Sequence, residues 1–211
     1  MRVLIFGDSI TQGFFDTKGG WVNRLALKYQ EATLKSLNGD WHEIFNLGVS
    51  GHTVQDVIDR VENETKARRW RDDPIAIVVA IGINDSQLIS NKVLTKEYKF
   101  QEQYEKLVDL VVRISDQSLF VGLSAVDEKL TNPWEFSTGK EQFLNNRINL
   151  FEDCIKQVCE QKNVRFLPFN DMFIGQLDGK QSLLADVLHP DEAGHALLYE
   201  MIAPEIAKIL S

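Results

Sequence analysis

The run Ile75–Ile81 constrains the fold more than any other part of the sequence, because its seven consecutive residues are all apolar. The run is far too short to cross a membrane, and isoleucine and valine, which favour strands, make up most of it. A strand without polar side chains has to be covered on both faces, as happens in parallel sheets with helices on either side. The run therefore predicts a buried strand in an α/β fold.

Short β-rich runs of this kind alternate with longer helical patterns along the chain. The other short runs are Val3–Phe6, Glu43–Leu47, Leu119–Ser124 and Val164–Pro168. Apolar residues at helical spacing lie between and after them, within residues 21–32, 54–61, 104–112, 143–158 and 191–210. Strands that alternate with helices form right-handed βαβ units, which place the strands parallel in one sheet. We expect a three-layer α/β/α sandwich with five parallel strands.

Two local signals refine the helices. Thr53 precedes the second helical stretch and Asp56 stands three residues later, a variant of the capping box that predicts a helix N-terminus. Pro204 lies inside the last helical stretch, where it removes a backbone donor, so we expect it to kink that helix or split it in two.

Size and charge bound the classes of function. The 211 residues suit a single domain over residues 1–211, and the apolar share of 44% and charged share of 26% are ordinary for a globular protein. The chain has 23 Lys and Arg against 31 Asp and Glu, which gives a net charge of −8. An acidic surface argues against nucleic acid and anionic membranes as partners.

The ends and the cysteines indicate the compartment. No apolar run approaches the roughly 20 residues of a membrane span, and only four apolar residues follow Met1 and Arg2, too few for a signal peptide. Cys154 and Cys159 stand five apart in a helical pattern, on different helix faces, and are expected to be reduced thiols. The expected location is therefore the cytoplasm.

Residues with useful chemistry follow the predicted strands at their carboxyl ends, where ligands bind in open α/β sheets. Ser9 follows the first strand, Gly51 the second and Asn84 the third. Asp186 and His189 come after the fifth. If the sheet is as predicted, these five residues share one edge. They supply the nucleophile, the base, the group that orients the base and the oxyanion donors that acyl transfer requires.

Taken singly, these residues also have ordinary structural explanations. Asp186 can orient His189 from three residues away, and Pro190 keeps that histidine out of the helical region. The same segment is typical of a surface turn with an exposed histidine. Ser9 follows a glycine that permits a tight exit from the strand, yet a turn or N-cap serine would look the same.

The candidate oxyanion donors are ambiguous in the same way. Gly51 offers a backbone N–H and Asn84 a side-chain amide, although turn chemistry alone accounts for both. Ser50 is a second turn serine, but it is not in a Gly-x-Ser-x-Gly elbow, because position 52 is His52. Only the conjunction on successive strand ends, in this order, indicates a site.

With these residues in place, the sequence resembles the GDSL family of the SGNH-hydrolase superfamily over nearly the whole chain. Four blocks in family order carry the resemblance: Gly7-Asp8-Ser9-Ile10, Gly51 within Val49-Ser50-Gly51, Gly82-Ile83-Asn84-Asp85, and Asp186-Val187-Leu188-His189-Pro190. The first block has isoleucine where the family name has leucine, which is a conservative apolar replacement.

The resemblance implies a flavodoxin-like fold whose five parallel strands have the order 2-1-3-4-5. It implies Ser9 as nucleophile, His189 as general base and acid, and Asp186 as the residue that orients the histidine. The backbone N–H groups of Ser9 and Gly51, with the Asn84 side chain, would form the oxyanion hole.

No cofactor is expected. The sequence holds neither a Gly-x-Gly-x-x-Gly nor a Walker A motif, which leaves a nucleotide cofactor without support. A metal site built from Asp186, His189 and His195 is disfavoured, because six residues along a helix point the two histidines apart.

The expected activity is hydrolysis of small, soluble carboxylic esters through an acyl-enzyme. An acyltransferase with the same triad, a lysophospholipase or carbohydrate acetylesterase, and a non-catalytic binding protein are the alternatives. Asp8, and Trp134 and Phe136 in the long loop Asp127–Gly139, are candidate residues of the substrate pocket. The two aromatic side chains could instead pack that loop onto the core. The expected partner is a small-molecule ester, and exposed aromatic residues would also allow a homo-oligomer.

Overall fold

A computed structural model of the chain describes residues 1–36, 41–128, 131, 140–170, 173, 183–186 and 188–210. Its central sheet consists of β1 (Arg2–Gly7), β2 (Glu43–Gly48), β3 (Ile75–Ala80), β6 (Gln117–Val121) and β8 (Arg165–Leu167). The strands lie in the order β2-β1-β3-β6-β8, and every neighbouring pair is parallel. Counted along the chain this is the order 2-1-3-4-5, so the predicted fold class and strand order are confirmed.

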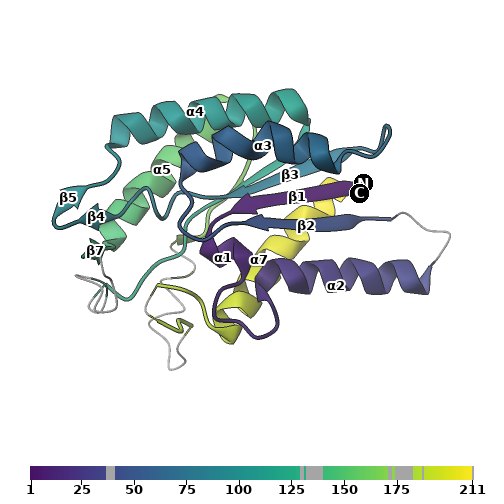
Figure 1. Cartoon of the computed structure of the whole chain (residues 1–211), viewed down its shortest axis with the longest axis horizontal. Helices are drawn as coiled ribbons and strands as arrows, with labels where there is room; N and C mark the ends of the chain where they lie inside the picture. Colours follow the sequence, from purple (N-terminus) through teal and green to yellow (C-terminus); the bar gives the residue numbers. More distant parts are fainter. Residues whose placement is uncertain are drawn as a thin grey trace.

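Helices cover both faces of the sheet (Figure 1). On one face lie α3 (Val54–Arg68), α4 (Glu97–Ile114) and α5 (Asn145–Gln161). On the other face lie α2 (Gly20–Lys35) and α7 (Glu192–Leu210), while the short α1 (Ser9–Gln12) follows the tip of β1. The three predicted layers are present.

Alternation along β3 explains why its sequence is apolar throughout. Ile77 and Val79 belong to the core beneath α3, α4 and α5, whereas Ala76 and Val78 belong to the core against α2 and α7. All four side chains are fully buried. Successive side chains of a strand point to opposite faces, so a central strand between two helical layers has no position for a polar residue.

Several boundaries differ from the sequence prediction. The fourth central strand, β6, begins two residues earlier than expected and ends at Val121 instead of Ser124. Of the two outcomes expected at Pro204, the split is wrong, because α7 continues through the proline, and the kink stays a prediction. Ala203, Ile206 and other apolar residues on both sides of the proline are buried against the sheet, and this packing outweighs the lost hydrogen bond.

A small antiparallel sheet was not anticipated. Its strands are β4 (Leu88–Ile89), β5 (Lys92–Val93) and β7 (Glu141–Gln142), in the order β5-β4-β7. Strands of two residues are too short to produce a detectable alternation of polar and apolar side chains. They place Glu141 and the following residues close to the carboxyl ends of the central strands.

Other local predictions hold. Asp56 accepts hydrogen bonds from the Thr53 backbone N–H at 2.8 Å and hydroxyl at 2.7 Å, so the predicted cap of α3 is confirmed. Cys154 and Cys159 are free thiols, the second of them buried. Within the described residues, no helix combines the length and the apolar character that a bilayer crossing requires.

Candidate active site

Ser9 stands directly after β1, at the first position of α1. The chain turns sharply there because Gly7 has no side chain: a Cβ at that position would lie 2.6 Å from the Ala80 carbonyl oxygen and closer still to Thr11. Asp8 caps the helix, since its carboxylate accepts the Ile10 N–H at 2.9 Å. Ser9 is thereby held at the carboxyl edge of the sheet.

His189 joins Ser9 to Asp186 through an unbroken series of hydrogen bonds. The Ser9 Oγ atom lies 2.9 Å from His189 Nε2. On the other side of the ring, His189 Nδ1 lies 2.8 Å from Asp186 Oδ2 and 3.0 Å from Oδ1. The Asp186 carboxylate also accepts the backbone N–H groups of His189 at 2.8 Å and Leu188 at 3.2 Å. The three-residue spacing read from the sequence therefore produces one compact turn.

The ionised Asp186 carboxylate determines which ring nitrogen of His189 carries the proton. Burial alone would raise the pKa of Asp186, but hydrogen bonds from the ring and backbone of His189 outweigh it and hold the pKa below its ordinary value. An ionised Asp186 accepts a hydrogen bond from Nδ1–H, which leaves Nε2 as an acceptor for the Ser9 hydroxyl. Ser9 and His189 are only 5% and 7% exposed, so little water competes for this contact.

The predicted oxyanion donors face the same cleft as Ser9. Gly51 has a φ of +79°, and no atom lies within 4 Å of the place where a Cβ would stand. Glycine is therefore favoured at position 51 by the left-handed backbone conformation, and not because a side chain would clash with neighbouring atoms. The Asn84 amide donates to the His52 carbonyl at 2.9 Å, which fixes the amide plane, and an amide nitrogen carries a second N–H for a ligand.

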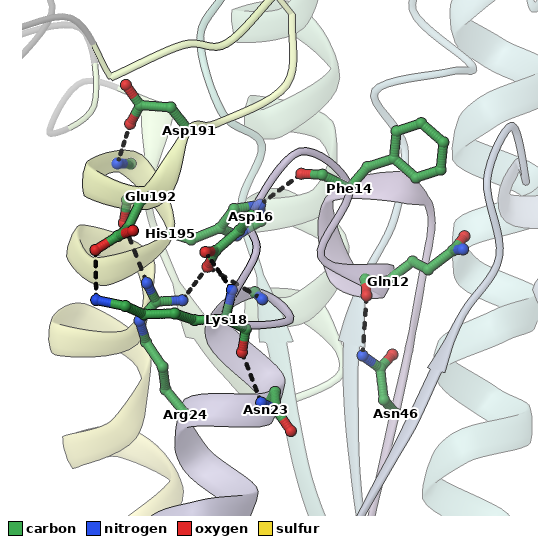
Figure 2. Close-up of polar contacts among 12 residues, drawn as sticks. Gln12, Phe14, Asp16, Lys18, Asn23, Arg24, Asn46, Asp191, Glu192 and His195 are labelled. Carbon is green, nitrogen blue, oxygen red and sulfur yellow. Dashed lines mark hydrogen bonds and ion pairs between the residues drawn. The ribbon is translucent and has the colours of Figure 1, made fainter.

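Gln12 and Asn46 support this site, and sequence reasoning missed both. Gln12 Oε1 accepts the Ser50 N–H at 3.0 Å, next to the proposed donor Gly51. The Asn46 amide donates to the carbonyls of Thr11 and Gln12, and the second of these contacts appears in Figure 2. Gln12 thereby connects α1 to the loop after β2, and Asn46 connects α1 to β2 itself. No sequence motif predicts the roles of Gln12 and Asn46, because their hydrogen-bond partners are backbone atoms of other segments.

An open cleft of about 680 Å³ adjoins Ser9. Its apolar walls are formed by Phe14, Phe15, Phe143 and Leu188. No Lys or Arg is found among its described lining residues, which otherwise include Ser9, Ser50, Gly51, Asn84, Gln87, Glu141, Ala185, Asp186 and His189. Phe14 and Phe15 were not predicted, although two adjacent phenylalanines directly after the Ser9 block are a signal that could have found them.

The predicted pocket residues have different outcomes. Trp134 and Phe136 lie outside the described residues. Asp8 is 3% exposed and lines a separate cavity of about 30 Å³, so the contact predicted between Asp8 and the substrate remains a prediction. Burial raises the pKa of Asp8 to about 6, against the hydrogen bond from Ile10 and the nearby His189, which lower it.

The strand order and the Ser9–His189–Asp186 arrangement define the class, since a serine, a histidine and an aspartate linked in this way are typical of serine hydrolases. A sequence model of the GDSL-like lipase/acylhydrolase family matches residues 5–197, and the chain belongs to that family. It is an esterase or acylhydrolase, an enzyme that acts on ester bonds.

Curated relatives and solved structures agree with this membership. An acetylxylan esterase of Geobacillus stearothermophilus is 26% identical over 214 residues, which cover 97% of this chain and 93% of the relative. A human protein, isoamyl acetate-hydrolyzing esterase 1 homolog, is 25% identical over 224 residues, which cover 100% of this chain and 83% of the relative. A lipase/acylhydrolase structure from Enterococcus faecalis has a TM-score of 0.73 at 20% identity and covers 97% of this chain and 94% of that one. The structural likeness shows the fold.

Proposed function

We propose that this enzyme hydrolyses small, neutral carboxylic esters, acetate esters foremost, through an acyl-enzyme on Ser9. The observation that carries the proposal is the series of hydrogen bonds from Asp186 through His189 to Ser9, at one end of an open cleft. His189 takes the Ser9 proton as Oγ attacks the ester carbonyl, and Asp186 stabilises the imidazolium that forms.

The oxyanion of the tetrahedral intermediate is held by the backbone N–H groups of Ser9 and Gly51 and by the Asn84 amide. The Ser9 N–H lies at the start of α1, where a helix has no partner for it, and is free to serve in this role. His189 then returns the proton to the departing alcohol. In the second half of the cycle, His189 takes a proton from the water that attacks the acyl-enzyme. It then returns this proton to Ser9 Oγ as the bond to the acyl group breaks and the acid leaves.

Two observations support small neutral esters as the substrates. Both curated relatives have names that specify acetate esters, one of a polysaccharide and one of a short alcohol. The described walls of the cleft carry Glu141 and Asp186 but no Lys or Arg, which disfavours substrates with phosphate groups, such as lysophospholipids.

Initial rates on p-nitrophenyl esters from acetate to octanoate, with isoamyl acetate, acetylated xylo-oligosaccharides and a lysophospholipid beside them, test the proposal. We expect the highest kcat/KM on acetate esters and no turnover of the lysophospholipid. A preference for octanoate or for the lysophospholipid would contradict the proposed substrate class. Acyl transfer to an added alcohol that outpaces hydrolysis would instead identify an acyltransferase with the same triad.

A further inference from the structure

The loop between α1 and α2 brings two aromatic rings against His189. The ring centroid of Phe14 lies 5.7 Å and that of Phe15 5.4 Å from the centroid of the imidazole. The two phenylalanine rings also contact each other, edge to face, at 5.1 Å. Phe14 and Phe15 are 41% and 54% exposed, so burial in the core does not account for their position.

The backbone of Phe15 is strained where it presents its ring. Its φ of +61° lies in the left-handed region, which a bulky side chain without a polar group rarely adopts. Such conformations persist only where the surrounding structure enforces them, and they concentrate at functional sites. The loop is therefore held in a shape that costs stability and that directs an exposed ring toward His189.

A partly buried ion pair between Asp16 and Arg24 anchors this loop (Figure 2). The Asp16 carboxylate accepts the backbone N–H groups of Lys18 at 2.9 Å and Gly20 at 3.1 Å, and it forms an ion pair with Arg24. Arg24 also donates to the Glu192 carbonyl at 3.3 Å. The loop is thus tied both to α2 and to the start of α7.

His195 completes the anchor from α7. Its side chain is fully buried, and Nε2 lies 3.1 Å from the Phe14 carbonyl oxygen. A carbonyl only accepts, so Nε2 carries the proton of this histidine. The Phe14 N–H in turn donates to the Ser9 carbonyl at 3.1 Å. Figure 2 shows the Phe14 carbonyl directed at His195 and its ring on the opposite side.

We propose that His195 is a positioning residue of the esterase site: through the Phe14 carbonyl it sets the Phe14–Phe15 pair against His189, where the rings stabilise the imidazolium that forms when Ser9 gives up its proton. An aromatic ring attracts a cation that lies over its face within roughly 6 Å of its centroid. Both centroids lie inside this distance, and the two rings are tilted by 41° and 52° to the imidazole plane. The proposal rests on the proposed role of His189 as the base.

A fluorophosphonate probe tests this pair without any choice of ester. Ser9 Oγ forms a bond to phosphorus, fluoride leaves, and His189 takes the hydroxyl proton, so the labelling rate reports on the same imidazolium. In the His195→Leu variant we expect the labelling rate and kcat to fall roughly 3- to 30-fold, with KM within about twofold of wild type. In His195→Gln the side-chain amide can still donate to the Phe14 carbonyl, and the rate should return to within about threefold of wild type.

A second variant keeps the proposal testable if His195→Leu does not fold. Glycine accepts a positive φ without strain, so Phe15→Gly should keep or raise the melting temperature while it slows labelling roughly 3- to 10-fold. Arg71→Gly is the matched control: Arg71 is exposed, has a φ of +50° and lies between α3 and β3, at the far end of the strand from Ser9. Its labelling rate should equal that of wild type.

Each outcome has a distinct meaning. Equal labelling rates for His195→Leu and His195→Gln, or a wild-type rate for Phe15→Gly, would overturn the proposal. Wild-type protein that labels at Ser9 but does not turn over acetate esters would refute the proposed substrates and leave these rate comparisons valid. Wild-type protein that does not label at Ser9 would refute both.

Discussion

His189 and His195 stand six residues apart in one segment, yet their surroundings give them different chemistry. His189 lies between a carboxylate and a hydroxyl, so a proton can pass from Ser9 to its ring while Asp186 stabilises the charge. His195 is fully buried and donates to a backbone carbonyl, which can only accept. Burial also lowers the pKa of His195, so its ring stays neutral and serves as a fixed donor.

The comparison teaches that the partner of a histidine, and not the histidine itself, decides whether the residue moves protons or holds structure. Both residues contact the same phenylalanine from opposite sides, since the Phe14 ring packs against His189 and the Phe14 carbonyl accepts from His195. The proposed base and the proposed positioning residue are therefore connected through one side chain and its backbone.

Substitution at the two histidines should separate these roles most clearly. We expect Ser9→Ala and His189→Ala each to lower kcat by at least about 10³, because either change removes proton transfer from the nucleophile. His195→Leu should cost at least tenfold less than either. Measured kcat on p-nitrophenyl acetate, with circular dichroism as the control for folding, decides this. Near-normal activity of purified Ser9→Ala would remove Ser9 from the mechanism.

Asn84 adds a third residue to this comparison, because its amide donates one hydrogen bond to the protein and has a second N–H for a ligand. Like His195, its side chain donates to a backbone carbonyl, in this case that of His52. Unlike a neutral imidazole, the amide has a second N–H, which we propose for the oxyanion. Asn84→Ala should therefore lower kcat about 10²- to 10³-fold, as loss of one oxyanion donor does.

Gln87→Ala is the matched control for Asn84→Ala, because Gln87 also presents an amide to the cleft and contacts the Asn84 backbone. Its kcat should stay within a fewfold of wild type. If the two variants lose activity equally, the effect belongs to local structure, and Asn84 has no special role in binding the oxyanion.

The sequence predicted the parts of this molecule that depend on periodicity and strand order. An apolar run at Ile75–Ile81 requires cover on both faces, and the carboxyl ends of parallel strands meet at one edge. Ser9, Asn84 and His189 could therefore be placed together from the sequence alone. What escaped prediction depends on the path of loops. The Phe14 carbonyl meets His195, and the Ser50 N–H meets Gln12, only once each segment has folded against the other.

The sequence locates Asp8 and Asp186 near the site but does not show which of the two has a raised pKa and which a lowered one. Asp8 is adjacent to Ser9, and Asp186 stands three residues before His189. Neither spacing indicates which carboxyl is ionised. In the structure Asp186 collects hydrogen bonds from a ring and two backbone amides, whereas Asp8 is buried with few donors. Their pKa values consequently move in opposite directions from the ordinary aspartate value.

Because the pKa of Asp8 is raised and that of Asp186 is lowered, the two residues should make protein stability depend on pH in opposite ways. A carboxyl whose pKa is raised in the folded protein binds its proton more tightly there than in the unfolded chain, so its contribution to stability falls as pH rises. For Asp8 this window runs from the ordinary 3.8 to about 6, and the corresponding change in unfolding free energy is up to about 3 kcal/mol. For Asp186, whose pKa is lowered, stability is instead lost as pH falls below 3.8.

Asp8→Asn tests the first of these effects, because asparagine keeps an acceptor for the Ile10 N–H and cannot ionise. Urea unfolding of both proteins from pH 4 to pH 7 should show wild type losing stability relative to Asp8→Asn across that window, with no further relative change above it. In Asp186→Asn the relative change should have the opposite sign and lie below pH 4. A constant stability difference between wild type and Asp8→Asn from pH 4 to pH 7 would mean that Asp8 ionises normally. The pKa values of Asp8 and Asp186 would then not differ in the direction that the structure indicates.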